Sequence, residues 1–159
     1  MEEIFIGKIV NVFGIKGELK IVSSFDMPDK AFKKNNIIII NKEEHLITSV
    51  RFHKNNYLVE IDNLKDINLV LKYKGYNVFI KKDYLNLKQE EYLIEELYNL
   101  DVYDNSEFIG KVTEVINNKI NPLIKVNDSF YIPLKGNFID TVDIKSQKII
   151  CQNIGGLML

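Results

Sequence analysis

The sequence predicts a mainly all-β protein built from two small β-barrels, and three observations carry this prediction. Short segments rich in β-branched and aromatic residues recur along the whole chain, which is the composition of strands. Glycine, asparagine and proline separate these segments at short intervals, which is the composition of turns. So many short strands need their edges covered, and closure into a barrel covers them. At 159 residues, the chain is long enough for two such domains.

In the first half of the chain, residues 13–18 are predicted to connect two strands as a hairpin. Gly14 and Gly17 supply backbone angles that a residue with a Cβ resists, and they let successive N–H groups face one way. Lys16 lies between them, where its ammonium group stands clear of the barrel wall. Such a tip suits a phosphate or a carboxylate, but a solvated turn lysine has the same sequence pattern.

The first half continues with further strands and one short helix. Residues 23–30 are expected to form a loop, because proline and acidic residues break any regular pattern there. The four isoleucines at residues 37–40 indicate a strand buried on both faces. A helix is expected from about 64 to 72, capped by Asp62 and Asn63. The strands predicted in this half are residues 4–12, 19–22, 37–40, 45–53, 57–61 and 76–80.

The strand pattern lapses after the first half and then resumes. We therefore expect an N-terminal barrel at residues 1–83, a linker at 84–90 and a second barrel at 91–159. Pro133 and Gly156 are assigned structural roles, like the two glycines of the hairpin tip. The strands predicted in this half are residues 101–103, 109–116, 123–126, 130–133, 142–144 and 148–152.

Charge is distributed unevenly between the two halves. Residues 1–88 carry 15 Lys and Arg against 11 Asp and Glu, a net charge of +4, whereas residues 89–159 carry 6 against 11, a net charge of −5. The basic half suits a polyanion and the acidic half suits a basic protein. Arg51 is the only arginine, so nucleic-acid contacts should reach phosphates through lysine and carry no sequence reading. A compositional bias of the source genome would also explain the abundance of lysine, asparagine and isoleucine.

Composition argues against several classes of protein. Cys151 is the only cysteine, so neither a disulfide framework nor a cysteine metal site is expected, and a reducing compartment is favoured. No apolar run approaches the ~20 residues that span a bilayer. The N-terminal residues Met1-Glu2-Glu3 are acidic where a signal peptide would be basic. We expect a cytoplasmic protein with no membrane segment and no cofactor.

The residues give little support for an enzyme. His45 and His53 bracket one predicted strand at ~26 Å, too far apart to share a metal ion. No glycine-rich loop has the spacing of a nucleotide-binding site. No catalytic residue and no metal site are predicted, although a magnesium-dependent nuclease using acids such as Asp140 and Asp143 remains an alternative.

Short segments in both halves carry a resemblance through their order and spacing. In the first half these are Gly7-Lys8-Ile9-Val10, Gly14-Ile15-Lys16-Gly17-Glu18, Pro28 with Phe32-Lys33-Lys34, Val50-Arg51-Phe52-His53-Lys54, Asp66-Ile67-Asn68 and Lys74-Gly75. In the second half they are Glu91-Tyr92, Leu97 and Leu100, Gly110-Lys111-Val112, Ile132-Pro133, Val142-Asp143 and Gly156-Leu157. The ordered set covers essentially the whole chain and resembles the bacterial ribosome maturation factor family RimM.

The resemblance implies a non-catalytic assembly factor. Such a factor binds the immature small (30S) ribosomal subunit, assists maturation of its head and is needed for efficient 16S rRNA processing. It also implies an N-terminal six-stranded barrel like those of translation factors, and a C-terminal PRC-barrel associated with the basic ribosomal protein S19. The charge split agrees, with 16S rRNA phosphates facing the basic half, and a monomer is expected. The alternative is an RNA-binding, translation-factor-like barrel protein whose second half is only structural.

The resemblance also implies where partners bind. The family usually has two tyrosines and a tryptophan where this chain has Tyr92-Leu93-Ile94, and the tyrosine pair is associated with docking to the subunit. Tyr92 equally suits a packing role at the start of a domain, and an acidic cluster is often only a charged surface. The residues predicted to bind partners are Tyr92, Leu93, Glu91, Glu95 and Lys16.

Overall fold

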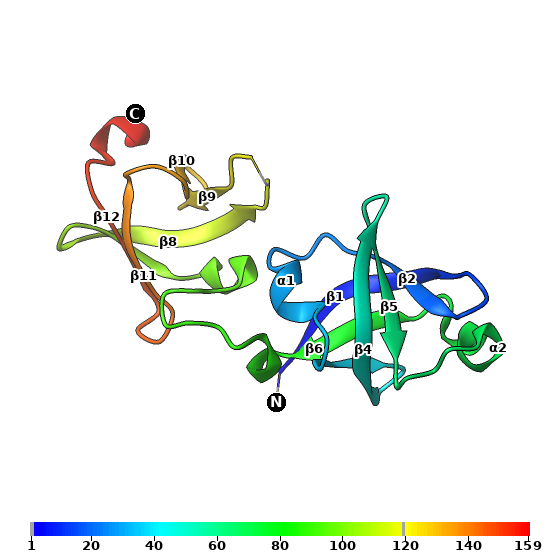
Figure 1. The fold of residues 1–159 in the computed structure, drawn as a ribbon. Helices are drawn as coiled ribbons and strands as arrows, with labels where there is room; N and C mark the ends of the chain where they lie inside the picture. The colour runs from blue at the N-terminus through cyan, green and yellow to red at the C-terminus, as the bar shows by residue number, and fades with distance from the viewer. Residues whose placement is uncertain (1, 119) are drawn as a thin grey trace. The chain divides into compact units, whose positions relative to one another are not determined.

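The computed structural model describes residues 2–118 and 120–159, which fall into two compact units. The first unit ends at Asn86 and the second comprises Leu87–Leu159. Both units consist mainly of β-strands (Figure 1), so the predicted fold class is confirmed. None of the helices in the described part of the chain has the length and apolar character needed to cross a bilayer.

The described strands of the first unit form a closed barrel in the order β1-β2-β5-β4-β3-β6. Every neighbouring pair is antiparallel, and β-bulges interrupt the β1–β2, β1–β6 and β4–β5 ladders. Bulges bend strands and increase their twist, which allows a short sheet to close. The strands are β1 (Glu3–Phe13), β2 (Glu18–Val22), β3 (Ile37–Ile40), β4 (Glu43–His53), β5 (Asn56–Ile61) and β6 (Asn77–Lys81).

The barrel interior is filled by the aliphatic residues that the strand pattern indicates. Leu19 and Ile21 of β2 alternate with more exposed neighbours and are fully buried. In the isoleucine run, Ile38, Ile39 and Ile40 are at most 4% exposed, as expected for a strand covered on both faces.

The helix expected at residues 64–72 is shorter than predicted and begins later. It consists of α2 (Ile67–Val70) followed by the 3₁₀ turn η1 (Leu71–Tyr73). Asp66 is the N-cap, and its side chain accepts a backbone N–H at 2.9 Å. Asp62 and Asn63 have φ of +52° and +56°, so they turn the chain after β5 and do not cap the helix.

Two segments predicted as irregular contain helical turns. The loop at residues 23–30 leads into α1 (Pro28–Ala31), because a proline in the first helical turn sacrifices no intrahelical hydrogen bond. The start of the predicted linker falls in the 3₁₀ turn η2 (Lys82–Leu85), and Leu85 is fully buried. In each segment one apolar side chain is buried, Ala31 in α1 and Leu85 in η2, and this burial helps to order the polar residues around it.

The second unit contains a six-stranded sheet, counted over its described residues, in the order β10-β9-β8-β7-β12-β11. Its ladder leaves β10 and β11 as edge strands. β12 pairs with β7 in parallel, and the other neighbours are antiparallel. β11 begins three residues before the predicted 142–144. The strands are β7 (Asp101–Asp104), β8 (Glu107–Ile116), β9 (Leu123–Val126), β10 (Phe130–Pro133), β11 (Ile139–Asp143) and β12 (Lys148–Cys151).

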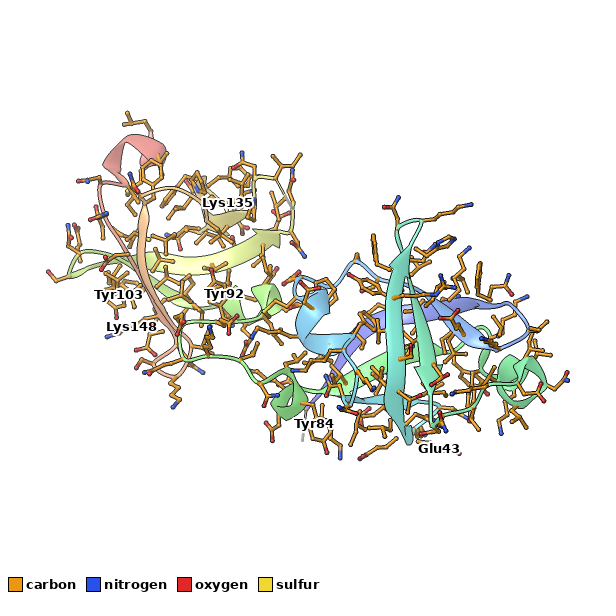
Figure 2. All side chains as sticks on the ribbon, in the orientation of Figure 1. Glu43, Tyr84, Tyr92, Tyr103, Lys135 and Lys148 are labelled. Carbon is orange, nitrogen blue, oxygen red and sulfur yellow. The ribbon has the colours of Figure 1, made fainter. Side chains whose placement is uncertain are left out.

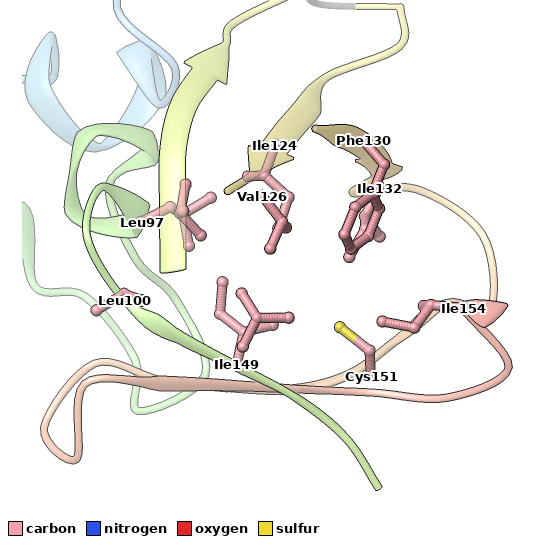
Figure 3. Close-up of a cluster of buried hydrophobic side chains, with 11 residues drawn as sticks. Leu97, Leu100, Ile124, Val126, Phe130, Ile132, Ile149, Cys151 and Ile154 are labelled. Carbon is pink, nitrogen blue, oxygen red and sulfur yellow. The ribbon is translucent and has the colours of Figure 1, made fainter. Parts of the chain in front are cut away.

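One apolar core organises the second unit (Figure 3). Side chains from five strands and from the 3₁₀ turn η3 (Ile94–Leu97) meet there, and Ile154 lies just before the C-terminal turn η4 (Gly155–Met158). The turns before and after the sheet are therefore anchored in the same core as its strands. The buried members are Leu97, Leu100, Val102, Val112, Ile124, Val126, Phe130, Ile132, Ile149, Cys151 and Ile154.

Candidate partner-binding surfaces

The tip of the β1–β2 hairpin is a tight turn built on two glycines, as the sequence predicts. Gly14 and Gly17 have φ of +71° and +74°, and the Gly17 N–H donates to the Gly14 carbonyl at 3.2 Å. Between them Lys16 is exposed. The tip also contacts α2, because the Ile67 N–H donates to the Ile15 carbonyl at 3.0 Å.

Gly17 is required for a second reason, which the sequence does not reveal. A Cβ at this position would lie 2.8 Å from Cγ2 of Val70 and 3.0 Å from the carbonyl oxygen of Asp66. The chain at Gly17, just before β2, therefore packs directly on α2 and the Asp66 cap, with no room for a side chain. A Cβ at Gly14, by contrast, would have no other atom within 4 Å. The tip that presents Lys16 is held in place by this contact.

An aromatic and charged cluster lies at the ends of β1 and β4. The Arg51 guanidinium donates to Glu18 through Nη2 at 2.8 Å and through Nε at 3.0 Å. These hydrogen bonds raise the pKa of Arg51 above its usual value. The guanidinium also lies 5.4 Å from the ring centre of Phe13, which itself packs against His53. Glu18 compensates the charge of Arg51, so Lys16 supplies the positive charge of the tip.

In the second unit, Tyr92 packs against the apolar core and is only partly exposed (Figure 2). Burial raises the pKa of its hydroxyl. Leu93, the next residue, is 2% exposed. In the structure, the side chain of Leu93 therefore packs in the interior. The predicted contact of Leu93 with a partner stays a prediction.

The acidic residues around η3 divide into two kinds. Glu91 accepts the Lys88 N–H at 2.9 Å and Glu96 accepts the Leu93 N–H at 2.8 Å, so both carboxylates hold the local backbone. Glu95 is exposed. Glu91 and Tyr92 thus lie in the segment just before η3, whereas Glu95 lies within η3 and presents its charge to solvent.

The remaining predicted positions lie at the ends of elements. Pro133 is the last residue of β10, where its missing N–H is tolerated. Gly156 lies in η4, has no positive φ, and a Cβ there would meet nothing within 4 Å. Glycine is therefore not demanded by the local geometry at that position.

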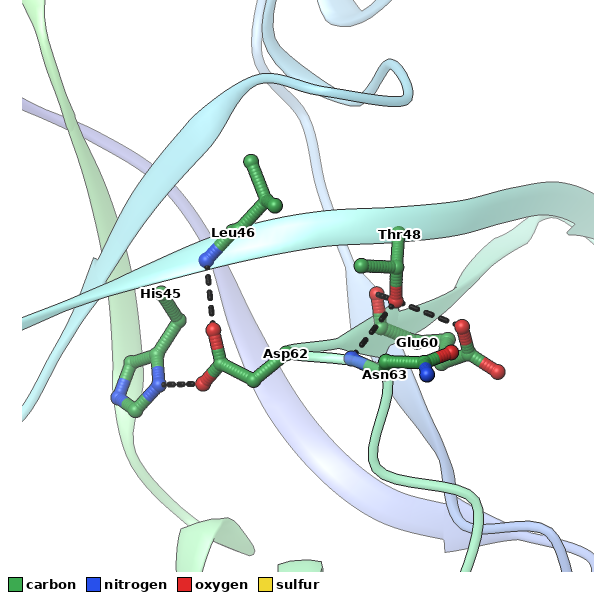
Figure 4. Close-up of polar contacts among 6 residues, drawn as sticks. All are labelled: His45, Leu46, Thr48, Glu60, Asp62 and Asn63. Atoms are coloured by element: carbon green, nitrogen blue, oxygen red, sulfur yellow. Dashed lines mark hydrogen bonds and ion pairs between the residues drawn. The ribbon is translucent and has the colours of Figure 1, made fainter.

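The two histidines lie in unrelated surroundings. His45 is 6% exposed, and its Nδ1 lies 2.6 Å from Oδ2 of Asp62, whose other oxygen accepts the Leu46 N–H at 2.9 Å (Figure 4). His53 instead packs on Phe13. Within residues 2–118 and 120–159, no group of three or more His, Cys, Asp and Glu side chains is arranged to hold a metal ion. The His45–Asp62 pair was not foreseen, since 17 residues separate its members.

A second polar cluster closes the same end of the β4–β5 ladder (Figure 4). The Thr48 hydroxyl lies 2.6 Å from Oε2 of Glu60 and accepts the Asn63 N–H at 3.1 Å. Together with Asp62, this cluster satisfies backbone groups where the chain leaves the barrel. Its hydrogen bonds give these polar residues a structural role.

Cys151 is expected to resist thiol reagents as long as the protein is folded. It is fully buried, and burial, with Asp104 adding a smaller effect, raises its pKa to about 11. At pH 8 almost no thiolate is present to react. We expect maleimide labelling to be slow in buffer and rapid in guanidinium chloride. Rapid labelling of the folded protein would contradict the burial.

Comparison with known proteins gives a consistent result. A family model described as the RimM N-terminal domain matches residues 4–85. The protein named ribosome maturation factor RimM in Oenococcus oeni is 31% identical, over 99% of this chain and 98% of that protein. The RimM protein of Ligilactobacillus salivarius is 32% identical over 96% of each chain, and that of Exiguobacterium sp. is 28% identical over 99% and 98%.

Proposed function

The chain belongs to the RimM family, and from this premise we propose that it is a non-catalytic ribosome maturation factor of the cytoplasm. It binds the immature small (30S) ribosomal subunit as a monomer, assists maturation of the subunit's head and is needed for efficient 16S rRNA processing. Its relatives carry the name ribosome maturation factor, which supports this assignment.

The second unit, which we assign as a PRC-barrel, binds the basic ribosomal protein S19. The observation that carries this proposal is the acidic turn around Tyr92. Glu95 is exposed three residues after Tyr92, whose ring is half buried, and residues 87–159 contain 7 Lys against 11 Asp and Glu, a net charge of −4. An aromatic anchor near an exposed carboxylate, in a unit of net negative charge, suits a cationic protein surface.

The first unit contacts 16S rRNA phosphates through the β1–β2 tip. Lys16 is exposed on a turn that α2 holds in position, so the backbone that carries its ammonium group needs no reordering on binding. Lysine acts as a point charge, which suits a phosphate without reading a base.

Sedimentation through a sucrose gradient tests the proposal. We expect the full-length protein to travel with free small subunits from cells and to be absent from joined 70S ribosomes, since an assembly factor leaves before subunits join. Equal binding to both particles, or binding to neither, would contradict the assignment. Cleavage of precursor rRNA by the purified protein, abolished by a chelator, would show the nuclease alternative instead.

Lys16→Ala is expected to weaken subunit binding mainly at low salt. Removing one phosphate contact lowers the slope of log affinity against log salt by about 0.7 to 0.9. Binding measured at several salt concentrations gives this slope. Lys145→Ala, which removes an exposed lysine from the acidic unit, should leave the slope unchanged. If both variants show the same slope of log affinity against log salt, Lys16 does not contact an RNA phosphate.

A further inference from the structure

The β4–β5 hairpin carries a row of aromatic rings that the proposed function does not use. Phe52 is 61% exposed and lies opposite Tyr57 in the ladder. Their ring centres are 5.0 Å apart at 61°, an edge-to-face pair. Tyr57 in turn stacks on Phe32, with 4.6 Å between ring centres at 18°. The row runs from a buried ring, through a partly exposed one, to an exposed one.

This row is rigid before any partner arrives. Phe32 is only 5% exposed and anchors its inner end. At the outer end, Lys54 and Asn55 have φ of +48° and +65°, so they form the tight two-residue turn whose twist matches the strands. Because its support is already in place, the ring of Phe52 loses little conformational freedom on binding. The entropic cost of a contact with this ring is therefore small.

The chain segments that carry the rings are strongly basic. Residues 29–34 and 51–57 contain four lysines and Arg51 against the single acid Asp29, a net charge of +4, which falls to +3 when Glu18, the ion-pair partner of Arg51, is counted. Lys33 and Lys34 follow Phe32 directly, and Lys54 follows Phe52 by two residues. All three are exposed, and no ion pair engages them within the described residues. The positive charge near the rings therefore favours binding of an anionic partner.

Single-stranded RNA fits these features better than an acidic peptide does. An edge-to-face pair leaves at least one face of Phe52 uncovered by Tyr57, and a flat uncovered ring suits a base. Each nucleotide also brings a phosphate for a neighbouring lysine. An acidic peptide would use the lysines but would gain no stacking from the ring.

We propose that this surface, comprising Phe32, Phe52 and Tyr57 with Lys33, Lys34 and Lys54, binds unpaired RNA by stacking a base on Phe52. The inference rests on the proposed function and deepens it. It assigns the first unit a single-stranded segment as its target, at a site separate in sequence from Lys16. Stacking tolerates any base, so recognition is of unpaired strand and not of sequence.

Fluorescence anisotropy with a labelled single-stranded RNA of mixed sequence tests the site. An RNA of about 12 nucleotides falls within the span of known single-strand sites. We expect the full-length protein to bind it, and Phe52→Ala to bind at least about fivefold more weakly, the lower end of what one stacked base contributes. Phe52→Tyr keeps a stacking face and should restore binding.

Phe5→Ala is the matched control in the same unit. Phe5 is 51% exposed and forms an edge-to-face pair with Phe79 at 5.8 Å, but Glu3 lies two residues before it on the same strand. This variant removes a ring of comparable exposure and should bind RNA like the original protein. Equal losses for Phe52→Ala and Phe5→Ala would overturn the proposal, as would an RNA duplex that binds as tightly as the single strand.

Two further measurements separate the possible explanations. Lys33→Gln with Lys34→Gln should reduce the salt slope by up to about 1.4, since each phosphate contact to a single strand contributes about 0.7. If polyglutamate binds the protein and loses affinity in Phe52→Ala as RNA does, the site is an acidic-peptide site and the proposal fails. Sedimentation with small subunits is scored independently: subunit binding with no RNA binding rejects this inference alone, and RNA binding without subunit binding rejects only the proposed function.

Discussion

Gly17→Ala is expected to destabilise the first unit by about 2–5 kcal/mol. A left-handed backbone costs a residue with a Cβ about 1–2 kcal/mol, and Gly17 has φ of +74°. The new methyl group would also overlap Val70 Cγ2 at 2.8 Å and the Asp66 carbonyl at 3.0 Å. Overpacking of this kind costs about 1–3 kcal/mol. The carbonyl is part of the cap of α2 and has little freedom to move away.

Gly14→Ala separates the two contributions. Gly14 has nearly the same φ, +71°, but a Cβ there has nothing within 4 Å. Only the backbone cost of about 1–2 kcal/mol should appear. Urea unfolding of both variants, followed by circular dichroism, measures the difference. Equal midpoints would mean that α2 moves away from the new methyl group without cost, which would contradict the tight packing at Gly17.

The hairpin tip also illustrates how far sequence reasoning reaches. Two glycines flanking a lysine predict a turn that exposes Lys16, and the structure has that turn. The packing of Gly17 on α2 was not predictable, because Val70 lies 53 positions away along the chain. Local conformational preferences are visible in the sequence, but contacts between distant segments are not.

Element types were predicted better than element ends. Strands depend on β-branched composition over several residues, so the isoleucine run at 37–40 was unambiguous. The N-cap of α2 was misplaced because Asp62 and Asp66 both suit a cap. What decides between them is the buried His45, which takes Asp62 as its partner 17 residues away. The parallel pairing of β12 with β7 likewise depends on contacts across the whole second unit.

For the candidate surfaces, the sequence predicts the net charge of each segment, but it does not predict which side chains are exposed or in contact. Net charge by segment separates a basic half from an acidic half. It does not tell Glu91, whose carboxylate binds a backbone N–H, from Glu95, which is exposed. The row from Phe32 to Phe52 joins two segments that are 20 residues apart. Such a row appears only once β5 has paired with β4.

Tyr92→Ala is expected to weaken small-subunit binding by about 2 kcal/mol or more, the threshold of a binding hot spot, or about thirtyfold in affinity. Tyr92 lies just before the acidic turn η3, and its side chain packs on the core of the second unit. The ring is therefore already positioned when the partner arrives. Cosedimentation over a range of subunit concentrations measures the affinity. The loss should persist at high salt, because removal of a ring takes away contact area and no charge.

Truncating Tyr92 also removes packing from the core, so lost binding must be distinguished from lost folding. Tyr92→Phe retains the ring and should keep both stability and most of the affinity. Tyr98→Ala removes a ring that is 55% exposed just after the same turn, so it tests whether any nearby aromatic matters. If Tyr92→Ala binds normally while its melting temperature falls, the tyrosine is a packing residue, and the exposed carboxylate of Glu95 becomes the contact to test next. If binding falls while the melting temperature holds, the ring touches the partner directly.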